Sequence, residues 1–162
     1  MDFFKVIENR HSVRKFADKP VERELLEAIV STASTAPSSR NSKSTALMII
    51  EDQDTITALS EMRDSGSAFM KGAKAVIVVT GDESKTDLWV DNCAISATFI
   101  QLAATALKLG SCWVHINGRP RRKDAPDGET AEAYVKELLG IKDGFRAYCA
   151  VAIGYPQESE AL

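Results

Sequence analysis

The chain has 162 residues, of which 44% are hydrophobic, so its length and composition suit one globular domain with a substantial core. A net charge of −3 argues against a nucleic-acid partner or an acidic membrane surface as the target of the whole protein. No segment approaches the roughly 18 unbroken apolar residues of a membrane span. The three cysteines are odd in number and far apart, which favours a reducing cytoplasm and buried thiols over a disulfide framework or a metal site.

Hydrophobic periodicity predicts helices and strands that alternate irregularly along the chain. Helices are expected over residues 2–9, 21–35, 54–63, 87–109 and 129–139, with a ragged extension of the third toward Met70. Strands are expected over residues 45–50, 75–80, 112–116 and 148–155. No internal repeat is visible, so we predict one α+β domain over residues 1–162, with a single sheet covered by helices.

Two of these segments carry further information. Residues 75–80 form a continuous apolar run, which is typical of a central strand buried on both faces. The pattern over 87–109 is apolar almost all round from Ile95 to Leu107, which places this helix in a core or at a subunit interface. Gly110 is expected to end the helix.

Arg10-His11-Ser12-Val13-Arg14 lies between the first two predicted helices and combines two guanidinium groups with a hydroxyl. On an extended backbone, residues two apart share a face, so Arg10, Ser12 and Arg14 would converge. A planar guanidinium suits a phosphate group bidentately, and serine adds a neutral donor. The motif therefore predicts a site for a small phosphate-bearing ligand. The alternative is a solvated basic patch that balances acids elsewhere.

A second polar loop, Ala36-Pro37-Ser38-Ser39-Arg40-Asn41-Ser42, connects the second helix to the first strand. The Asn41 amide offers a donor and an acceptor together, which can recognise the edge of a heterocyclic ring such as the flavin pyrimidine. The alternative is an ordinary helix-to-strand loop, because Pro, Ser and Asn are common in loops.

Several partial motifs follow one another from residue 3 to residue 156: RHSVRKF, APSSRNS, a helix passing Trp89 and Asp91, AATALKLGSCWV and VAIGYP. In this series the chain resembles the FMN-dependent nitroreductase family. The resemblance implies a three-layer α+β fold in which a mostly antiparallel central sheet is flanked by helices. It also implies an intertwined homodimer with FMN bound in the subunit interface.

The resemblance assigns FMN-binding roles to three groups of residues. The phosphate and the ribityl chain would be held by the first motif: Arg10, Ser12 and Arg14, with His11 beside them. From the partner subunit, Pro37, Ser38 and Ser39 would lie against the isoalloxazine. Asn41 would form hydrogen bonds with the polar edge of the ring. The strand after the long helix would approach the ring, where a backbone N–H near flavin N5 is typical: Trp113, Val114 and His115.

The implied activity is that of an NAD(P)H oxidoreductase. A hydride would pass from NADH or NADPH to the flavin, and from the flavin to nitroaromatics, quinones or similar electron-poor acceptors. Because the flavin carries the chemistry, no catalytic side chain is required, and ping-pong kinetics are expected. The sequence has no Rossmann G-x-G-x-x-G, P-loop or G-x-S-x-G motif. The alternative is a non-enzymatic flavin- or nucleotide-binding protein of the same fold.

Two positions depart from the family pattern. Relatives often carry Lys or Arg after the GYP segment, whereas Gly154-Tyr155-Pro156 here runs into Gln157-Glu158. One phosphate contact is therefore missing, and we expect FMN to be held more loosely. Lys43-Ser44-Thr45 replaces a Gln-Pro-Trp sequence frequent in relatives, which alters the floor of the acceptor pocket and suggests an approach of Lys43 to the pyrimidine edge of the flavin.

Arg119-Pro120-Arg121-Arg122-Lys123 is a local basic run with three candidate partners: the 2′-phosphate of NADPH, an anionic substrate or nucleic acid. Acidic residues follow at Asp124, Asp127 and Glu129, so we interpret the run as a solvated loop. The expected partners are a second copy of the chain and a small electron acceptor, with no nucleic acid and no membrane.

Overall fold

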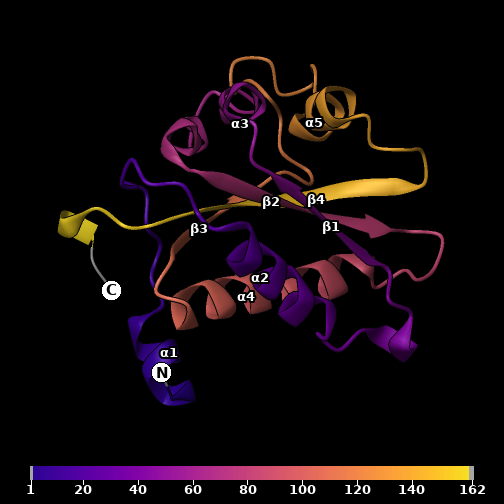
Figure 1. Cartoon of the computed structure of the whole chain (residues 1–162). Coiled ribbons are helices and arrows are strands. Elements are labelled where there is room, and N and C mark those ends of the chain that lie inside the picture. The colour runs from indigo at the N-terminus through magenta and orange to yellow at the C-terminus, as the bar shows by residue number, and fades with distance from the viewer. Residues whose placement is uncertain (1, 161–162) are drawn as a thin grey trace.

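The computed structural model describes residues 2–160 (Figure 1). Its α-helices are α1 (Phe3–Asn9), α2 (Arg23–Ser34), α3 (Gln53–Ser60), α4 (Trp89–Ala106) and α5 (Ala131–Leu139). Its strands are β1 (Thr45–Ile50), β2 (Ala75–Asp82), β3 (Gly110–His115) and β4 (Phe145–Gly154). Short 3-10 turns are η1 (Ser39–Asn41), η2 (Ala68–Gly72) and η3 (Glu158–Glu160). Each predicted helix and strand is present, with its ends shifted by a few residues.

The strands form one antiparallel sheet in the order β1-β2-β4-β3. β2 lies between two strands and is buried along its length except at Asp82, which confirms the central strand predicted from its apolar run. β1 and β3 are the edges of this sheet. One side of β3 is therefore covered by no other strand of the sheet.

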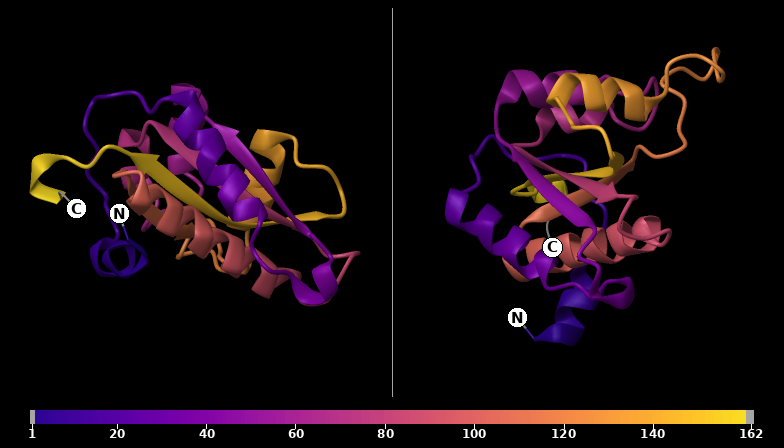
Figure 2. Two further views of the ribbon diagram at one scale, coloured as in Figure 1. Left: turned by 60° about the horizontal axis from the view of Figure 1, so that its bottom comes forward. Right: turned by 90° about the vertical axis from the view of Figure 1, so that its right-hand side faces the viewer.

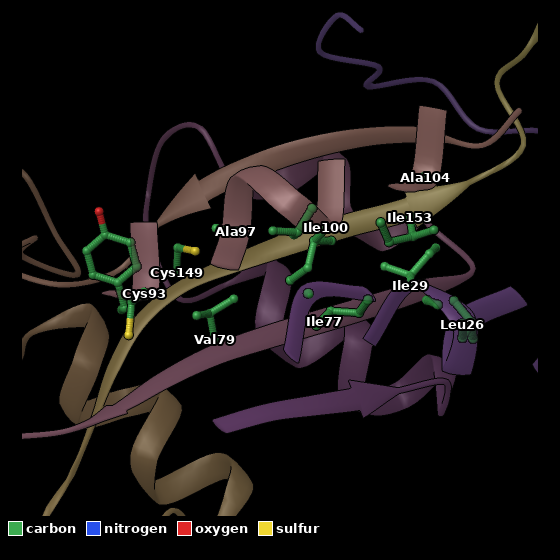
Figure 3. Close-up of a cluster of buried hydrophobic side chains, with 14 of the residues drawn as sticks. Leu26, Ile29, Ile77, Val79, Cys93, Ala97, Ile100, Ala104, Cys149 and Ile153 are labelled. Atoms are coloured by element: carbon green, nitrogen blue, oxygen red, sulfur yellow. The ribbon is translucent and has the colours of Figure 1, made fainter. Parts of the chain in front are cut away.

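Helices cover both faces of the sheet, as Figures 1 and 2 show. α2 and α4 pack on one face, over a cluster of large buried side chains (Figure 3) that includes Leu26, Ile29, Ile77, Ile100 and Ile153. α3 and α5 cover the other face, over a second cluster that includes Ile56, Leu59, Met62, Met70 and Val135. Each such side chain contributes about 1.5–3 kcal/mol through its burial. The three-layer α+β architecture predicted from the family resemblance is confirmed.

α4 ends earlier than predicted, at Ala106. After it, Lys108 takes the left-handed conformation (φ 62°) and closes a Schellman turn. Within that turn, Lys108 N donates to Thr105 O at 3.0 Å and Leu109 N donates to Ala104 O at 2.8 Å. A side chain with a Cβ makes this conformation less favourable than it would be for glycine.

Gly110 therefore does not end α4, and that prediction was wrong. Gly110 is the first residue of β3, where a Cβ would lie 2.7 Å from Val13 Cγ1. No real Cβ comes this close to another carbon, so glycine is required here because Val13 packs directly on the backbone.

β4 contains a β-bulge at Tyr148. Its register with β2 shifts between Val79 and Thr80, so Tyr148 has no partner on β2. The Tyr148 carbonyl accepts instead from the N–H groups of Ile116 and Asn117, both at 3.0 Å. The bulge turns the Tyr148 ring toward the α4 side of the sheet, next to the end of β3.

The thiols of Cys93, Cys112 and Cys149 are buried, as predicted, and no disulfide joins them. Burial raises the pKa of the Cys93 thiol to about 11, so this thiol stays protonated and unreactive at neutral pH. Within residues 2–160, no helix combines the length and the apolar character needed to cross a bilayer.

We expect Lys108→Gly to stabilise the fold, because glycine adopts a positive φ without the steric cost of a Cβ. The gain in the free energy of unfolding should be about 1 kcal/mol, measured by urea denaturation. Gly140 takes the same conformation (φ 60°) after α5, so Gly140→Ala is the matched control and should lose a similar amount. A Lys108→Gly protein less stable than the wild type would contradict the assigned role of this turn.

Candidate functional site

The connector of residues 10–17 is fixed to the free side of β3. Val13 N donates to Ser111 O at 3.0 Å, and Ser12 forms an isolated parallel bridge with Ser111. The side chains of Val13 and Phe16 are buried. Hydrogen bonds and apolar anchors together hold the connector against the edge of the sheet.

If side chains alternate along the connector as in an extended chain, Arg10, Ser12 and Arg14 are expected on the side opposite the buried Val13. Within residues 2–160, Arg10 takes part in no ion pair with a carboxylate. The Arg14 guanidinium carbon lies 5.9 Å from the centre of the Phe69 ring. Two guanidinium groups and a hydroxyl on one side are a donor set that fits a phosphate dianion.

Two neighbouring segments complete the surroundings of the connector. His11 is exposed, and its Nδ1 lies 3.0 Å from Asn9 O. Gln157 N donates to Lys15 O at 3.0 Å, and Gln157 Nε2 donates to Phe16 O at 3.2 Å. The position that follows the GYP segment therefore supplies an amide bonded to the connector backbone, and not a cation.

Beyond the connector, the outer edge of β3 presents backbone N–H and C=O groups that no other strand of the sheet covers. Because the Ser111 carbonyl accepts from the connector, and alternate residues direct their backbone groups to the same side, the N–H and C=O groups of Trp113 and His115 also face away from β4. Four steps of about 3.3 Å along the strand lead from Ser111 to His115, a distance of about 13 Å. Val114 alternates with them, and its side chain is buried on the α3 and α5 side.

An aromatic cluster lies at the far end of β3. The Trp113 and His115 rings stack with centroids 6.3 Å apart, and Trp113 Nε1 lies 3.4 Å from His115 Nδ1, as donor to acceptor. Tyr148 stands edge-on to both, at 5.5 Å and 5.1 Å, and Trp89 lies 6.4 Å from Tyr148. Sequence reasoning missed Tyr148, because a β-bulge leaves no mark on the hydrophobic period.

The charge state of His115 is set by its surroundings. Partial burial lowers the pKa of His115 below its usual 6.5, and the positive charges of Arg119 and Arg63 lower it further. Arg63 Nη1 also donates to His115 O at 3.4 Å. The imidazole is therefore neutral at pH 7, where it is a hydrogen-bonding group without charge. Arg63 was not predicted as part of a site.

The loop between α2 and β1 is strained. Arg40, Asn41 and Lys43 have φ angles of 51°, 53° and 47°, which residues with a Cβ rarely adopt. Asn41 N donates to Ser38 O at 2.9 Å. Such conformations concentrate at ligand-binding sites. The candidate residues of this loop are all exposed or half-buried: Pro37, Ser38, Ser39 and Asn41.

Asn92, buried in the first turn of α4, holds this loop in place. Its Oδ1 accepts from Ser39 N at 2.8 Å, and its Nδ2 donates to Ser42 Oγ at 3.2 Å and to Ser44 Oγ at 2.9 Å. Sequence reasoning noted the neighbouring Asp91 and missed Asn92. The signal that marks it is an amide at the start of an otherwise apolar helix.

The loop and the connector do not meet within one chain. The loop enters β1, whereas the connector lies on β3, at the opposite edge of the sheet. Three strand spacings of about 4.8 Å, or about 14 Å, separate the two edges. The structure thus places the connector that carries Arg10, Ser12 and Arg14 against β3, and the loop that carries Pro37–Asn41 at the opposite edge of the sheet.

The fold and this site define a three-layer α+β protein with a phosphate-type donor set on one edge of its sheet. Among residues 2–160, no three His, Cys, Asp or Glu side chains are grouped to hold a metal ion. The family model described as "Putative TM nitroreductase" matches residues 2–161. The chain therefore belongs to the nitroreductase family of oxidoreductases, and the resemblance drawn from its motifs is confirmed.

Individual relatives agree with this assignment. The chain is 30% identical over 160 residues to an Archaeoglobus fulgidus protein named "Putative NADH dehydrogenase/NAD(P)H nitroreductase", covering 96% of this chain and 86% of the relative. An FMN-dependent nitroreductase from Clostridium difficile R20291 superposes with a TM-score of 0.90 at 32% identity, covering 98% and 91% of the two chains. A Desulfovibrio desulfuricans protein described as a putative nitroreductase in complex with FMN shares the fold, with a TM-score of 0.79 at 20% identity over 100% and 90%.

We expect Asn92→Ala to destabilise the protein by about 2–3 kcal/mol, because it removes the hydrogen bonds of the loop and leaves the buried Ser44 hydroxyl without this partner. Urea denaturation measures the loss. Thr98→Ala, on the exposed side of α4, is the control and should change stability by less than about 0.5 kcal/mol. Equal stability of the two variants would show that the loop does not depend on Asn92.

His115 should titrate below 6.5 in an NMR pH titration, and Arg119→Gln should raise its pKa by removing a nearby positive charge. The unfolded chain binds this proton more readily, so the contribution of His115 to stability is complete above pH 6.5 and is lost as the pH falls toward the lower folded-state pKa. A His115 pKa at or above 6.5 would contradict the electrostatic surroundings assigned to it.

Proposed function

We propose that the protein is an FMN-dependent NAD(P)H oxidoreductase of the nitroreductase type, with one FMN-binding domain over residues 1–162 that acts as a homodimer in the cytoplasm. The observation that carries this proposal is the arrangement on the free edge of β3. A phosphate-type donor set lies at one end of that edge, and outward backbone groups and aromatic rings lie at the other. The C. difficile relative is itself described as FMN-dependent.

The residues present fit FMN. Arg10, Ser12 and Arg14 would hold its phosphate and ribityl chain, with His11 beside them. The outward N–H groups of β3 offer donors to a planar ring, and Trp113 with Tyr148 supplies an apolar wall. The same β3 residues, Trp113 and His115, would orient the ring.

When bound, FMN supplies the two-electron chemistry between a pyridine nucleotide and an electron-poor acceptor such as a nitroaromatic or a quinone. The chain itself would bind the cofactor, orient it and exclude water. The neutral His115 adds no charge next to the ring, and its Nδ1 accepts from Trp113. One open pocket used in turn by donor and acceptor would give ping-pong kinetics.

The proposed site also requires a second copy of the chain. An apolar groove of about 490 Å³ lies on the outer side of α4, lined by Phe3, Val6, Thr32, Phe99, Leu102, Ala103 and Ala106. Phe3 and Phe4 are exposed to 63% and 76%. A large apolar surface of this kind supports a subunit interface. The partner would bring its strained loop, with Pro37, Ser38, Ser39 and Asn41, to the β3 edge that the chain's own loop does not reach.

The amide at Gln157 weakens FMN retention under this proposal. A cation at that position would add a charge-assisted hydrogen bond to the phosphate, worth roughly 1.5–3 kcal/mol, or about ten- to a hundredfold in affinity. We therefore infer that the protein loses FMN more readily than relatives that carry the cation. The same feature favours the second candidate, a flavin- or nucleotide-binding protein without enzyme activity.

Anaerobic titration of FMN-loaded protein with NADH and with NADPH tests the proposal. The visible flavin absorbance should bleach with at least one nucleotide and return when a nitroaromatic or a quinone is added. Flavin that binds but does not bleach would identify the non-enzymatic alternative.

We expect Arg14→Ala to lower FMN affinity by about tenfold or more with little change in folding, because it removes one charge-assisted contact to the phosphate. Fluorescence titration of FMN measures the affinity, and circular dichroism checks the fold. The matched control is Arg122→Ala, whose exposed guanidinium pairs with Asp124 at 2.9 Å and should not affect FMN. Unchanged FMN affinity in Arg14→Ala would remove the phosphate role of the connector.

A further inference from the structure

Two arginines, Arg63 and Arg119, adjoin the end of β3 that is remote from the connector. Arg63 is half-buried, and its Nη1 donates to His115 O at 3.4 Å. Arg119 follows β3 in a tight turn, closed by a hydrogen bond from Arg119 N to Ile116 O at 3.1 Å with Gly118 at φ 67°. Both positive charges act on the His115 side chain.

The segments that carry these two arginines are tied together. Asp64 N donates to Arg121 O at 2.9 Å, and Lys123 N donates to Asp64 Oδ2 at 2.7 Å. The turn after α3, which carries Arg63, is therefore fixed to the loop that carries Arg119. The backbone positions of Arg63 and Arg119 are thereby linked, and both side chains are close enough to act on His115.

The arginines of the basic run, residues 119–123, differ in whether they form ion pairs with carboxylates. Arg121 and Arg122 are neutralised by carboxylates of the same loop, at 2.6 Å and 2.9 Å. In the described part of the chain, residues 2–160, neither Arg63 nor Arg119 forms an ion pair with a carboxylate. Two uncompensated cations near each other are stabilised by an anion placed between them. Arg119 is exposed in the same loop and differs from Arg121 and Arg122 in forming no ion pair with a carboxylate of residues 2–160.

We propose that Arg63 and Arg119 form an oxyanion subsite beside His115, which binds a phosphate or carboxylate group of the molecule that exchanges electrons with the flavin. This inference rests on the proposed function, since it takes the free edge of β3 as the flavin site. FMN has one phosphate, which the connector would hold near Ser111, and Ser111 lies about 13 Å along β3 from His115. A second oxyanion at the far end of β3 must then belong to the pyridine nucleotide or to the electron acceptor.

The chain offers a reporter for each site, because it has two histidines. His11 lies in the connector, and His115 lies beside the proposed subsite. Inorganic phosphate titrated into FMN-loaded protein at constant pH should shift the NMR signals of His115 in a saturable way and leave those of His11 unchanged. Should FMN not bind, the same titration of flavin-free protein still tests the subsite through His115, while His11 reports on the connector.

Three variants give this titration its control. Arg63→Gln and Arg119→Gln should each weaken the phosphate response of His115 by about tenfold, since each removes one charge-assisted contact. Arg122→Gln removes a charge from the same loop and should leave the response unchanged. A His115 signal that does not respond to phosphate, or a response equal in all variants, overturns the proposal.

Steady-state kinetics identify the source of the oxyanion. The donors to compare are NADH and NADPH, and the acceptors are 4-nitrobenzoate and the neutral 4-nitrobenzyl alcohol. In Arg119→Gln, kcat/KM should fall about tenfold for the ligand that carries the oxyanion and stay unchanged for neutral ligands. A fall confined to NADPH identifies the 2′-phosphate, a fall for both nucleotides the pyrophosphate, and a fall confined to 4-nitrobenzoate the acceptor carboxylate.

Measuring the FMN affinity of the variants shows whether Arg63 and Arg119 bind the flavin itself or a different anionic ligand. FMN affinity should stay within about twofold of wild type in Arg63→Gln and Arg119→Gln, and Arg63→Lys should retain most of the activity because it keeps the charge. Loss of FMN affinity would show that these groups hold the flavin itself and would overturn the proposal. An equal fall of kcat/KM for every donor and acceptor would do the same.

Discussion

The contact of Val13 with the backbone of Gly110 fixes the position of the connector on the sheet. A Cβ at residue 110 would lie within 3 Å of three atoms of the Val13 side chain, so the connector reaches β3 only because that residue has no side chain. The hydrogen bond from Val13 N to Ser111 O follows from the same approach. Burial of Val13 on one side favours a common orientation of Arg10, Ser12 and Arg14 on the other, as alternation along an extended chain predicts. A donor set spread over five residues thus becomes a site through one apolar anchor.

Local patterns were sufficient to predict the helices, the strands and the connector, because these depend on periodicity and on residues close in the chain. The features that were missed depend on contacts between distant residues. Gly110 follows a helical pattern, and only Val13, far away in the sequence, shows that it serves β3. Asn92 meets a loop about 50 residues earlier in the chain, and Arg63 meets His115 a similar distance later. A single sequence has no signal for such pairs unless the fold is known.

The positions of unpaired charges on this molecule say more about ligand binding than its net charge does. Surface ion pairs contribute little to stability, but they remove cations from the set that can bind a ligand. Arg146 is bonded to Glu132 and Glu83, and the carboxylates near residues 121 and 122 neutralise those arginines. Within residues 2–160, Arg10, Arg63 and Arg119 have no such carboxylate partner, and the segments that carry them all adjoin β3. A slightly acidic protein can therefore present two cationic places to a ligand.

The side of β3 that the sheet leaves uncovered also has a consequence for the newly made protein. Exposed N–H and C=O groups along a strand are a template on which other chains can add strands and aggregate. Under the proposed function, cofactor and second subunit both cover this template in the mature protein. Supply of the flavin would then decide the solubility of the newly made chain as well as its activity.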